Sequence, residues 1–302
     1  MKSLHLIGAP TDVGASIRGT SMGPEALRVA DIVGTLARDG LQVTDLGNLA
    51  GPANPGQGPV DGLRHLEEVV AWNTSVFQAA YEILANGRMP VLMGGDHCLA
   101  IGSISAAARH CRETGKQLMV LWLDAHADAN TGSTSPTGNI HGMPVACLCG
   151  DGPEPLTTLS GARPAMAAHD IRQIGIRSVD PEEKQRLREL GLPVFDMRYI
   201  DENGMRETMR QALAGLDANT HLHVSFDVDF LDCQIAPGVG TPVRGGPTYR
   251  ETHLALEMIA DTGALGSLDV LELNPARDIR NQTAELVVEL LESLFGKSTL
   301  LR

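Results

Sequence analysis

A short apolar run that ends in alternating acids and a histidine constrains the fold more than any other feature of this chain. Residues 118–123 have the pattern of a buried strand, and Asp-Ala-His-Ala-Asp follows directly at 124–128. On an extended backbone, side chains alternate between faces, so Asp124, His126 and Asp128 should share one face. Because a hydrophobic core cannot satisfy three such polar groups, the motif indicates a metal site at a strand end.

Two further motifs repeat this arrangement. Asp227 and Asp229 follow a strand-like stretch, and His97 follows the run 89–96. Taken singly, His97 could be a hydrogen-bonded structural histidine and the two aspartates could be turn formers. Taken together with the first motif, they supply four aspartates and two histidines. This set is too large for one ordinary site and suits two metal ions that share carboxylates.

The wider pattern of the chain predicts an α/β fold. Short apolar runs alternate with longer helical patterns, which is typical of βαβ units with a mostly parallel sheet between two helical layers. We therefore expect a three-layer α/β/α structure with one catalytic domain over residues 1–302, in which 51–62 and 150–164 are surface loops. The expected strands are 4–8, 41–44, 90–93, 119–123, 171–175, 193–195, 221–226 and 268–273, and the expected helices begin at 23 or span 65–85, 99–109, 182–189, 203–214, 249–261 and 283–294.

This topology predicts that the motifs converge. In open parallel sheets, ligands bind beyond the carboxyl ends of the strands, where His97, Asp124 and Asp227 are all expected. Glu272 lies near the carboxyl end of a fourth expected strand. Alone it could be a buried, structurally paired acid, but its place at the same edge favours a functional role.

Composition and cysteine usage exclude several classes of function. A net charge of −13 over 302 residues, without a basic stripe, argues against nucleic acid as a partner. The absence of a signal-like start and of a long apolar run predicts a cytoplasmic protein that does not bind a membrane. Five sparse cysteines predict free thiols, and the pair Cys147 and Cys149 is too closely spaced for a zinc hook.

The donor set favours a particular chemistry. Carboxylates and imidazoles without thiolates suit Mn²⁺ better than a structural zinc ion. Two such ions about 3.5–4 Å apart can activate a bridging water at neutral pH, so hydrolysis is expected. A phosphoryl substrate would need a cationic clamp, whereas acids, amides and hydroxyls surround these motifs and suit a cationic substrate. They are Asn130, Ser135, Thr137, Asn139, His141, Asp180, Glu183 and Glu272.

Four ordered segments carry a family resemblance. Gly-Gly-Asp-His at 94–97, the motif at 124–128, Ser-Pro-Thr-Gly-Asn-Ile-His at 135–141 and Ser-Phe-Asp-Val-Asp at 225–229 resemble the signature set of the ureohydrolase superfamily. The loop 135–141 resembles the arginase family within it. The match extends over most of the chain, and it implies an arginase-like fold and the hydrolysis of L-arginine to L-ornithine and urea.

The resemblance also implies roles for single residues. It implies one Mn²⁺ on His97, Asp124, Asp128 and Asp227, and a second on His126, Asp124, Asp227 and Asp229. Asp128 would relay a proton, His141 would act as a proton shuttle, and Glu272 would pair with the guanidinium group. The α-carboxylate would lie near Asn130, Thr137 and Asn139, and the α-amino group near Asp180 and Glu183. Homotrimers or homohexamers are implied by the family alone.

Departures from the family pattern are small. Cys98, Phe230 and Cys233 replace commoner residues, and Ser178 stands where some relatives carry an acid. Three alternatives stay open: another ureohydrolase acting on agmatine or a guanidino acid, a one-metal zinc amidohydrolase of the deacetylase type, and a metal-dependent regulatory or scaffold protein. The second would leave His126 and Asp229 without a role.

Overall fold

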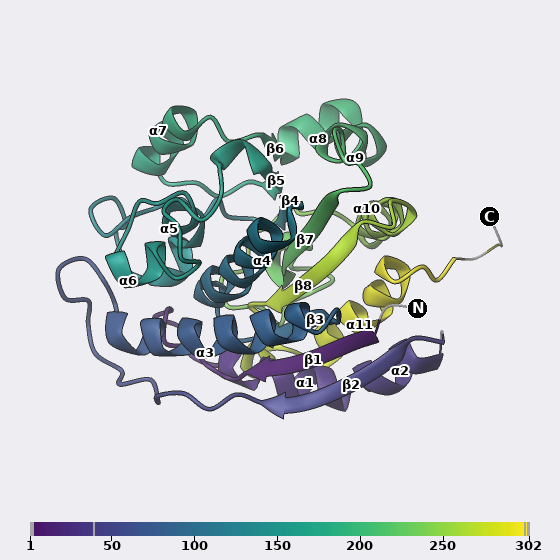
Figure 1. Cartoon of the computed structure of the whole chain (residues 1–302), viewed down its shortest axis with the longest axis horizontal. Coiled ribbons are helices and arrows are strands. Elements are labelled where there is room, and N and C mark those ends of the chain that lie inside the picture. Colours follow the sequence, from purple (N-terminus) through teal and green to yellow (C-terminus); the bar gives the residue numbers. More distant parts are fainter. Residues whose placement is uncertain (1–2, 39, 299, 301–302) are drawn as a thin grey trace.

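The computed structural model describes residues 3–38, 40–298 and 300. In this part of the chain, eight strands form one parallel sheet in the order β2-β1-β3-β8-β7-β4-β5-β6, seen nearly edge-on in Figure 1. The strands are β1 (Ser3–Ala9), β2 (Gln42–Asn48), β3 (Met89–Gly94), β4 (Gln117–Leu123), β5 (Ile171–Ile176), β6 (Val194–Asp196), β7 (Thr220–Asp227) and β8 (Leu265–Leu271).

Helices cover both faces of this sheet (Figure 1). One face packs mainly against α1, α2 and α9 to α11, and the other against α3 to α6, each through its own hydrophobic cluster. The helices are α1 (Gly23–Val29), α2 (Ile32–Arg38), α3 (Leu66–Ala85), α4 (Ala100–Thr114), α5 (Pro144–Leu148), α6 (Glu154–Thr157), α7 (Pro181–Leu190), α8 (Met197–Asn203), α9 (Met205–Ala212), α10 (Tyr249–Asp261) and α11 (Gln282–Leu294).

Strand β4 shows why a continuous apolar run forms a central strand here. Leu121 and Leu123 belong to the first cluster, whereas Val120 and Trp122 belong to the second, and all four are fully buried. Because successive side chains point to opposite faces, a strand covered on both sides must be apolar at every position. The predicted three-layer α/β/α class is thus confirmed, and the sheet is parallel throughout the described residues.

The predicted elements are largely confirmed, with corrections at their ends. The helix predicted at 203–214 is confirmed as α9 but begins later, because Gly204 with a φ of 80° separates it from α8. Strand β8 begins earlier than predicted and ends before Glu272, whose φ is 64°. The expected loop 150–164 contains the short helix α6, and α2, α5 and α8 were not predicted.

The expectation of an extended backbone through 124–128 is also wrong. Strand β4 ends at Leu123, and Asp128 has a φ of 50°, in the left-handed region. Such a conformation costs free energy for a residue other than glycine and persists where surrounding contacts hold it. Asp128 and Glu272 both lie at the edge of the sheet that carries the motifs, so two candidate site residues have a strained backbone.

None of the helices in the described residues is long and apolar enough to cross a lipid bilayer.

Candidate metal centre and substrate pocket

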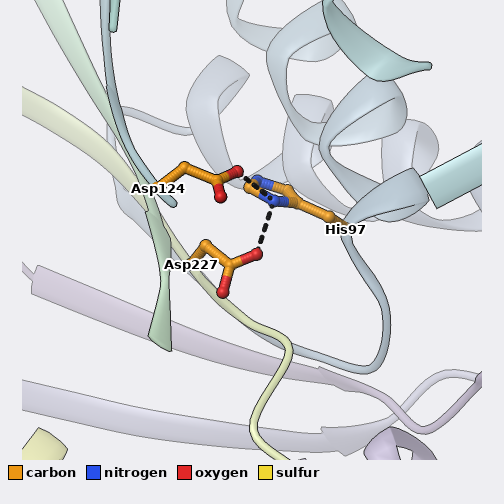
Figure 2. Close-up of side chains that lie close together, drawn as sticks. All are labelled: His97, Asp124 and Asp227. Carbon is orange, nitrogen blue, oxygen red and sulfur yellow. Dashed lines mark hydrogen bonds and ion pairs between the residues drawn. The ribbon is translucent and has the colours of Figure 1, made fainter. Parts of the chain in front are cut away.

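The three sequence motifs meet at the carboxyl edge of the sheet. His97 lies in the turn after β3, Asp124 directly follows β4, and Asp227 ends β7. These three side chains point toward one another (Figure 2), although β8 lies between β3 and β7 in the sheet. All three are almost completely buried. The glycine pair before His97 permits this approach, because a Cβ at Gly95 would lie 1.6 Å from the carbonyl oxygen of Thr11.

The first group of ligands has more acceptors than donors. Nδ1 of His97 lies 3.1 Å from a carboxylate oxygen of Asp124, 3.3 Å from one of Asp128 and 3.0 Å from one of Asp227. A single ring N–H cannot donate three good hydrogen bonds. A cation in their midst could satisfy the three carboxylates and the imidazole together, so the donor set fits a divalent metal ion.

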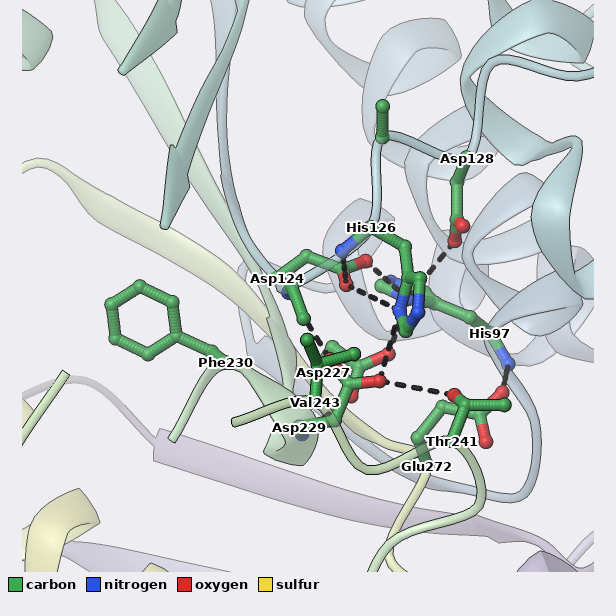
Figure 3. A network of polar contacts seen from close by, with 12 residues as sticks. His97, Asp124, His126, Asp128, Asp227, Asp229, Phe230, Thr241, Val243 and Glu272 are labelled. Carbon is green, nitrogen blue, oxygen red and sulfur yellow. Dashed lines mark hydrogen bonds and ion pairs between the residues drawn. The ribbon is translucent and has the colours of Figure 1, made fainter. Parts of the chain in front are cut away.

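A second group shares one residue with the first. Nδ1 of His126 lies 3.1 Å from Oδ2 of Asp229 and 3.6 Å from Oδ1 of Asp124. His97, Asp124 and Asp227 form one cluster with metal-ligand spacing, and Asp124, His126 and Asp229 form the other. Figure 3 shows both groups side by side. Asp124 therefore has the geometry of a shared ligand, whereas Asp227 belongs to the first cluster.

The pKa values of the crowded carboxylates shift in different directions. Burial and the charges of Asp229 and Asp124 raise the pKa of Asp227, and burial with the charge of Asp124 raises that of Asp128. Burial also opposes ionisation of Asp124, but hydrogen bonds from His126 and His97 lower its pKa. Without another cation, these acids cannot all stay ionised together, and a bound dication would remove that conflict.

The neighbouring carboxylates raise the pKa values of both histidines. Burial lowers the pKa of His97, but the hydrogen bond and charge of Asp124 outweigh it and raise the pKa to about 9. Burial likewise opposes protonation of His126, yet the charge of Asp229 and the hydrogen bond to Asp124 raise its pKa. Both imidazoles must lose a proton before they can bind a metal, so metal and protons compete for this site.

Sequence reasoning missed the residues that orient these ligands. Nε1 of Trp122 donates to Asp124 at 2.8 Å, and its ring stacks on His97 with centroids 4.2 Å apart. Oγ of Ser225 lies 2.9 Å from Nε2 of His97. Trp122 and Ser225 each stand two residues before a candidate ligand on a strand. The two-residue period could therefore have found them.

Glu272 links the candidate metal ligands to His141. Its Oε1 accepts from the backbone N–H of His97 and lies 2.9 Å from Nδ1 of His141, while its buried Oε2 has no hydrogen-bond partner among the described residues. Burial opposes its ionisation, but the charge and hydrogen bond of His141 lower its pKa. Glu272 therefore presents an ionised oxygen that lacks a donor, as a site for a cationic group would require.

Most of these groups line one cavity of about 260 Å³. Its walls include Asn130, Thr137, Asn139, Asp180 and Glu183, the residues expected around the substrate, and also Ser178. Every predicted site residue lines this cavity except Asp124 and Asp229, which lie behind its floor. The geometry thus brings the predicted residues together in a single polar pocket.

Short contacts hold the pocket walls in place. Asp180 and Glu183 form a capping box at the start of α7, and Oε1 of Glu183 also accepts from the backbone N–H of Ala129 at 2.8 Å. Nδ2 of Asn130 donates to Asp180 at 3.2 Å. This arrangement combines two acids with an amide at one end of the cavity. The acids could recognise an ammonium group and the amide a carboxylate.

Comparison with known proteins agrees with this geometry. The Arginase family profile matches residues 2–296. The arginase of Brevibacillus brevis is 41% identical over 300 residues, covering 99% of both chains, and that of Agrobacterium fabrum is 43% identical, covering 98% of this chain and 92% of the relative. The native crystal structure of Bacillus caldovelox arginase superposes with a TM-score of 0.93 at 40% identity, covering 99% of this chain and all of that chain. The chain therefore belongs to the arginase family of metal-dependent hydrolases.

Proposed function

We propose that this chain binds two Mn²⁺ ions at the carboxyl edge of its sheet and hydrolyses L-arginine to L-ornithine and urea. The observation that carries the proposal is the excess of carboxylates around His97 and His126, on the floor of a pocket walled by acids and amides. The family assignment supports the reaction, and the hard oxygen-rich donor set supports the metal.

Six residues would hold the ions. His97, Asp124, Asp128 and Asp227 would hold one, and Asp124, His126, Asp227 and Asp229 the other. When bound, such a pair would supply a strong water-derived nucleophile at neutral pH and neutralise the carboxylates. The cluster of Asp124, His126 and Asp229 speaks against the alternative of a one-metal zinc amidohydrolase, which would leave it unused.

Glu272 would bind and orient the guanidinium group. A guanidinium stays protonated in water and presents N–H donors in one plane. Oε1 of Glu272 is already engaged by His97 and His141, so Oε2 is the atom that would accept from the substrate. The lowered pKa of Glu272 keeps it ionised for this role.

His141 and Asp128 would transfer the proton that the leaving amine requires. Burial lowers the pKa of His141, but the charge of Glu272 raises it overall, so the ring can hold a proton near neutral pH. Since Nδ1 contacts Glu272, Nε2 is the nitrogen that can exchange a proton with the substrate. Asp128 would accept the proton from the nucleophile and pass it on, because its carboxylate lies beside His97 in the ligand group and also lines the pocket.

The other end of the pocket would select an amino acid. Asn130, Thr137 and Asn139 offer amide and hydroxyl groups for an α-carboxylate, and Asp180 with Glu183 offers acids for an α-ammonium group. A site with such polar partners disfavours an analogue that leaves them unpaired, at about 1–3 kcal/mol for each group. Agmatine lacks the carboxylate, so it should be a poor substrate.

Urea release from L-arginine, agmatine and guanidinobutyrate in the presence of Mn²⁺ tests this proposal. We expect kcat/KM for arginine to exceed that for the other two by at least about 100-fold, which corresponds to two lost polar contacts. Asn130→Ala combined with Thr137→Ala should narrow that gap by raising KM for arginine. If agmatine or guanidinobutyrate is hydrolysed faster than arginine, the chain is another ureohydrolase and the proposed arginase activity is wrong.

Three further points complete the proposal, and the last of them rests on the family resemblance alone. We propose that residues 1–302 form one catalytic domain, that the protein works in the cytoplasm, and that it assembles as a homotrimer or homohexamer. Light scattering at micromolar concentration would test the assembly, and a monomer would contradict it without touching the chemistry of the site.

A further inference from the structure

Arg177 makes an unusual set of contacts beside the second ligand group. It directly follows β5, and its guanidinium donates only to backbone carbonyls. Nη1 donates to Gly175 at 3.3 Å and to Phe230 at 3.1 Å. Nη2 donates to Asp229 at 2.7 Å, and it also reaches the carbonyl oxygens of Leu231 at 3.2 Å and Val243 at 2.9 Å.

Within the described residues, no carboxylate contacts this guanidinium directly, although the charges of Asp229 and Asp124 act on it from nearby. No ion pair to Arg177 is found within the described ranges, and its buried Nε has no hydrogen-bond acceptor there. The chain makes room for it, because a Cβ at Gly246 would lie 2.6 Å from Nη2. Arg177 is half-buried, and its guanidinium binds carbonyls in place of an acid. Partial loss of water is costly for a cation, so these contacts should matter for something beyond charge pairing.

Those contacts connect both sides of the second ligand group. The guanidinium holds the carbonyls of residues 229–231, which carry Asp229. The backbone N–H of Arg177 donates to the carbonyl of Ala125, and the N–H of Ala125 donates to Oδ1 of Asp229 at 3.1 Å. Ala125 is the neighbour of His126. Arg177 therefore links the two segments that bring His126 and Asp229 together.

We propose that Arg177 is a positioning residue for the second metal position, holding residues 229–231 so that the carboxylate of Asp229 faces Nδ1 of His126. The inference rests on the proposed two-metal site. The positioning effect should be selective, because none of the five carbonyls bound by the guanidinium belongs to β3 or to the turn that carries His97. The first metal position should therefore depend much less on Arg177 than the second.

Arg172 provides a matched control on the same strand. It lies at the other end of β5, and its Nη1 donates to the backbone carbonyls of Ala212 and Ala214, far along the strand from the motifs. Arg172→Met and Arg177→Met thus remove the same group and the same kind of hydrogen bond. Arg177→Lys keeps the charge but not the planar fork that reaches several carbonyls at once.

The test measures Mn²⁺ bound per chain by equilibrium dialysis and elemental analysis, with thermal unfolding as a check on folding. In Arg177→Met we expect one ion at nearly wild-type affinity and a second weakened about 10- to 100-fold, the usual range for residues that support metal ligands. Arg177→Lys should weaken the second ion less, and Arg172→Met should bind both ions normally.

Three results decide the matter. If both Arg177 variants bind two ions with wild-type affinity, or lose both ions to the same degree, the positioning role is wrong. If Arg177→Met does not fold, the lysine variant alone must show the selective loss for the proposal to stand. A wild-type protein that binds fewer than two ions would instead contradict the proposed metal site, which separates the two failures.

Discussion

Two buried clusters of histidines and acids lie in the same sheet and share strand β7, and only one of them has the character of a metal site. The metal-edge cluster consists of the six candidate ligands at the carboxyl edge. The mid-strand cluster lies between β7, β8 and α4, further from that edge. It consists of Ser103, His221, His223, Ser267 and Asp269, each at most 5% exposed.

The mid-strand cluster pairs its donors and acceptors. His223 contacts Oγ of Ser267 at 2.8 Å through Nδ1 and Asp269 at 3.1 Å through Nε2. Ser103 also donates to Asp269, and His221 lies 2.9 Å from Oγ of Ser267. One carboxylate thus faces two donors, so the network needs no cation. The metal-edge cluster instead gathers three carboxylates around one ring nitrogen. Excess acceptors, rather than buried polarity, distinguish the candidate metal centre.

The largest effect should come from Asp227→Asn, which removes a charge from the metal-edge cluster but keeps the shape. Metal binding should fail and activity should fall at least about 1,000-fold, because the ions contribute several kcal/mol to the reaction. The metal-free variant should nevertheless melt at a higher temperature than metal-free wild type. The pKa of Asp227 is raised in the fold, so its ionised form destabilises the native state at neutral pH.

Calorimetry with and without Mn²⁺ measures both effects of Asp227→Asn. Wild type should gain stability from the metal by mass action, and the variant should not. A metal-free variant that is less stable than metal-free wild type would show that Asp227 is satisfied without a cation.

Asp269→Asn should have a smaller and opposite effect. The amide would leave a donor of His223 or Ser103 without a good acceptor, which should lower the free energy of unfolding by about 1–3 kcal/mol. Both ions should still bind, because Asp269 is not a ligand. Urea unfolding and metal analysis on the same sample would check this. Loss of metal in this variant would contradict the claim that only the metal-edge cluster binds the ions.

The smallest effect should come from removing the ion pair between Arg28 and Asp45, which lies at the edge of the sheet. Asp45 accepts from Nε of Arg28 at 2.7 Å and from Nη2 at 3.0 Å, and its side chain is 24% exposed. The hydrogen bond to Arg28 lowers the pKa of Asp45 despite partial burial. Asp45→Asn should therefore cost about 0.5–1 kcal/mol at pH 7, as expected for a partly exposed ion pair.

The pH dependence of that cost follows from the lowered pKa. Ionised Asp45 stabilises the fold fully above its unfolded pKa of about 3.9, and the contribution is lost as the pH falls through the lower folded value. Denaturant unfolding of wild type and Asp45→Asn from pH 7 downward should show their difference shrinking in acid. A difference that grows in acid would contradict the ion pair.

The sequence was sufficient to predict the strands and the convergence of their carboxyl ends. A strand buried on both faces must be apolar, so the run before Asp124 stands out, and polar residues that follow such runs must gather at one edge. The same logic placed His97 and Asp227 beside it. Strand β2 was predicted too short because it lies at the edge of the sheet, where half-exposed polar residues weaken the apolar pattern.

Other features depend on contacts between distant segments and leave no local pattern. Arg177 binds carbonyls more than 50 residues further along the chain, and nothing near it in the sequence indicates those acceptors. The left-handed backbone of Asp128 and Glu272 likewise leaves no reliable local signal, since few non-glycine residues adopt it and most aspartates and glutamates do not. Only Gly204 could have signalled the break between α8 and α9.

Counting the divalent ions bound to the wild-type chain tests the central claim most directly. After dialysis against Mn²⁺ and removal of free metal, elemental analysis should give two ions per chain. Metal-free protein titrated with Mn²⁺ in a calorimeter should show the same stoichiometry and should release protons, because the raised pKa values of Asp227 and His97 must fall as the ions bind. A single ion, or binding without proton release, would contradict the account.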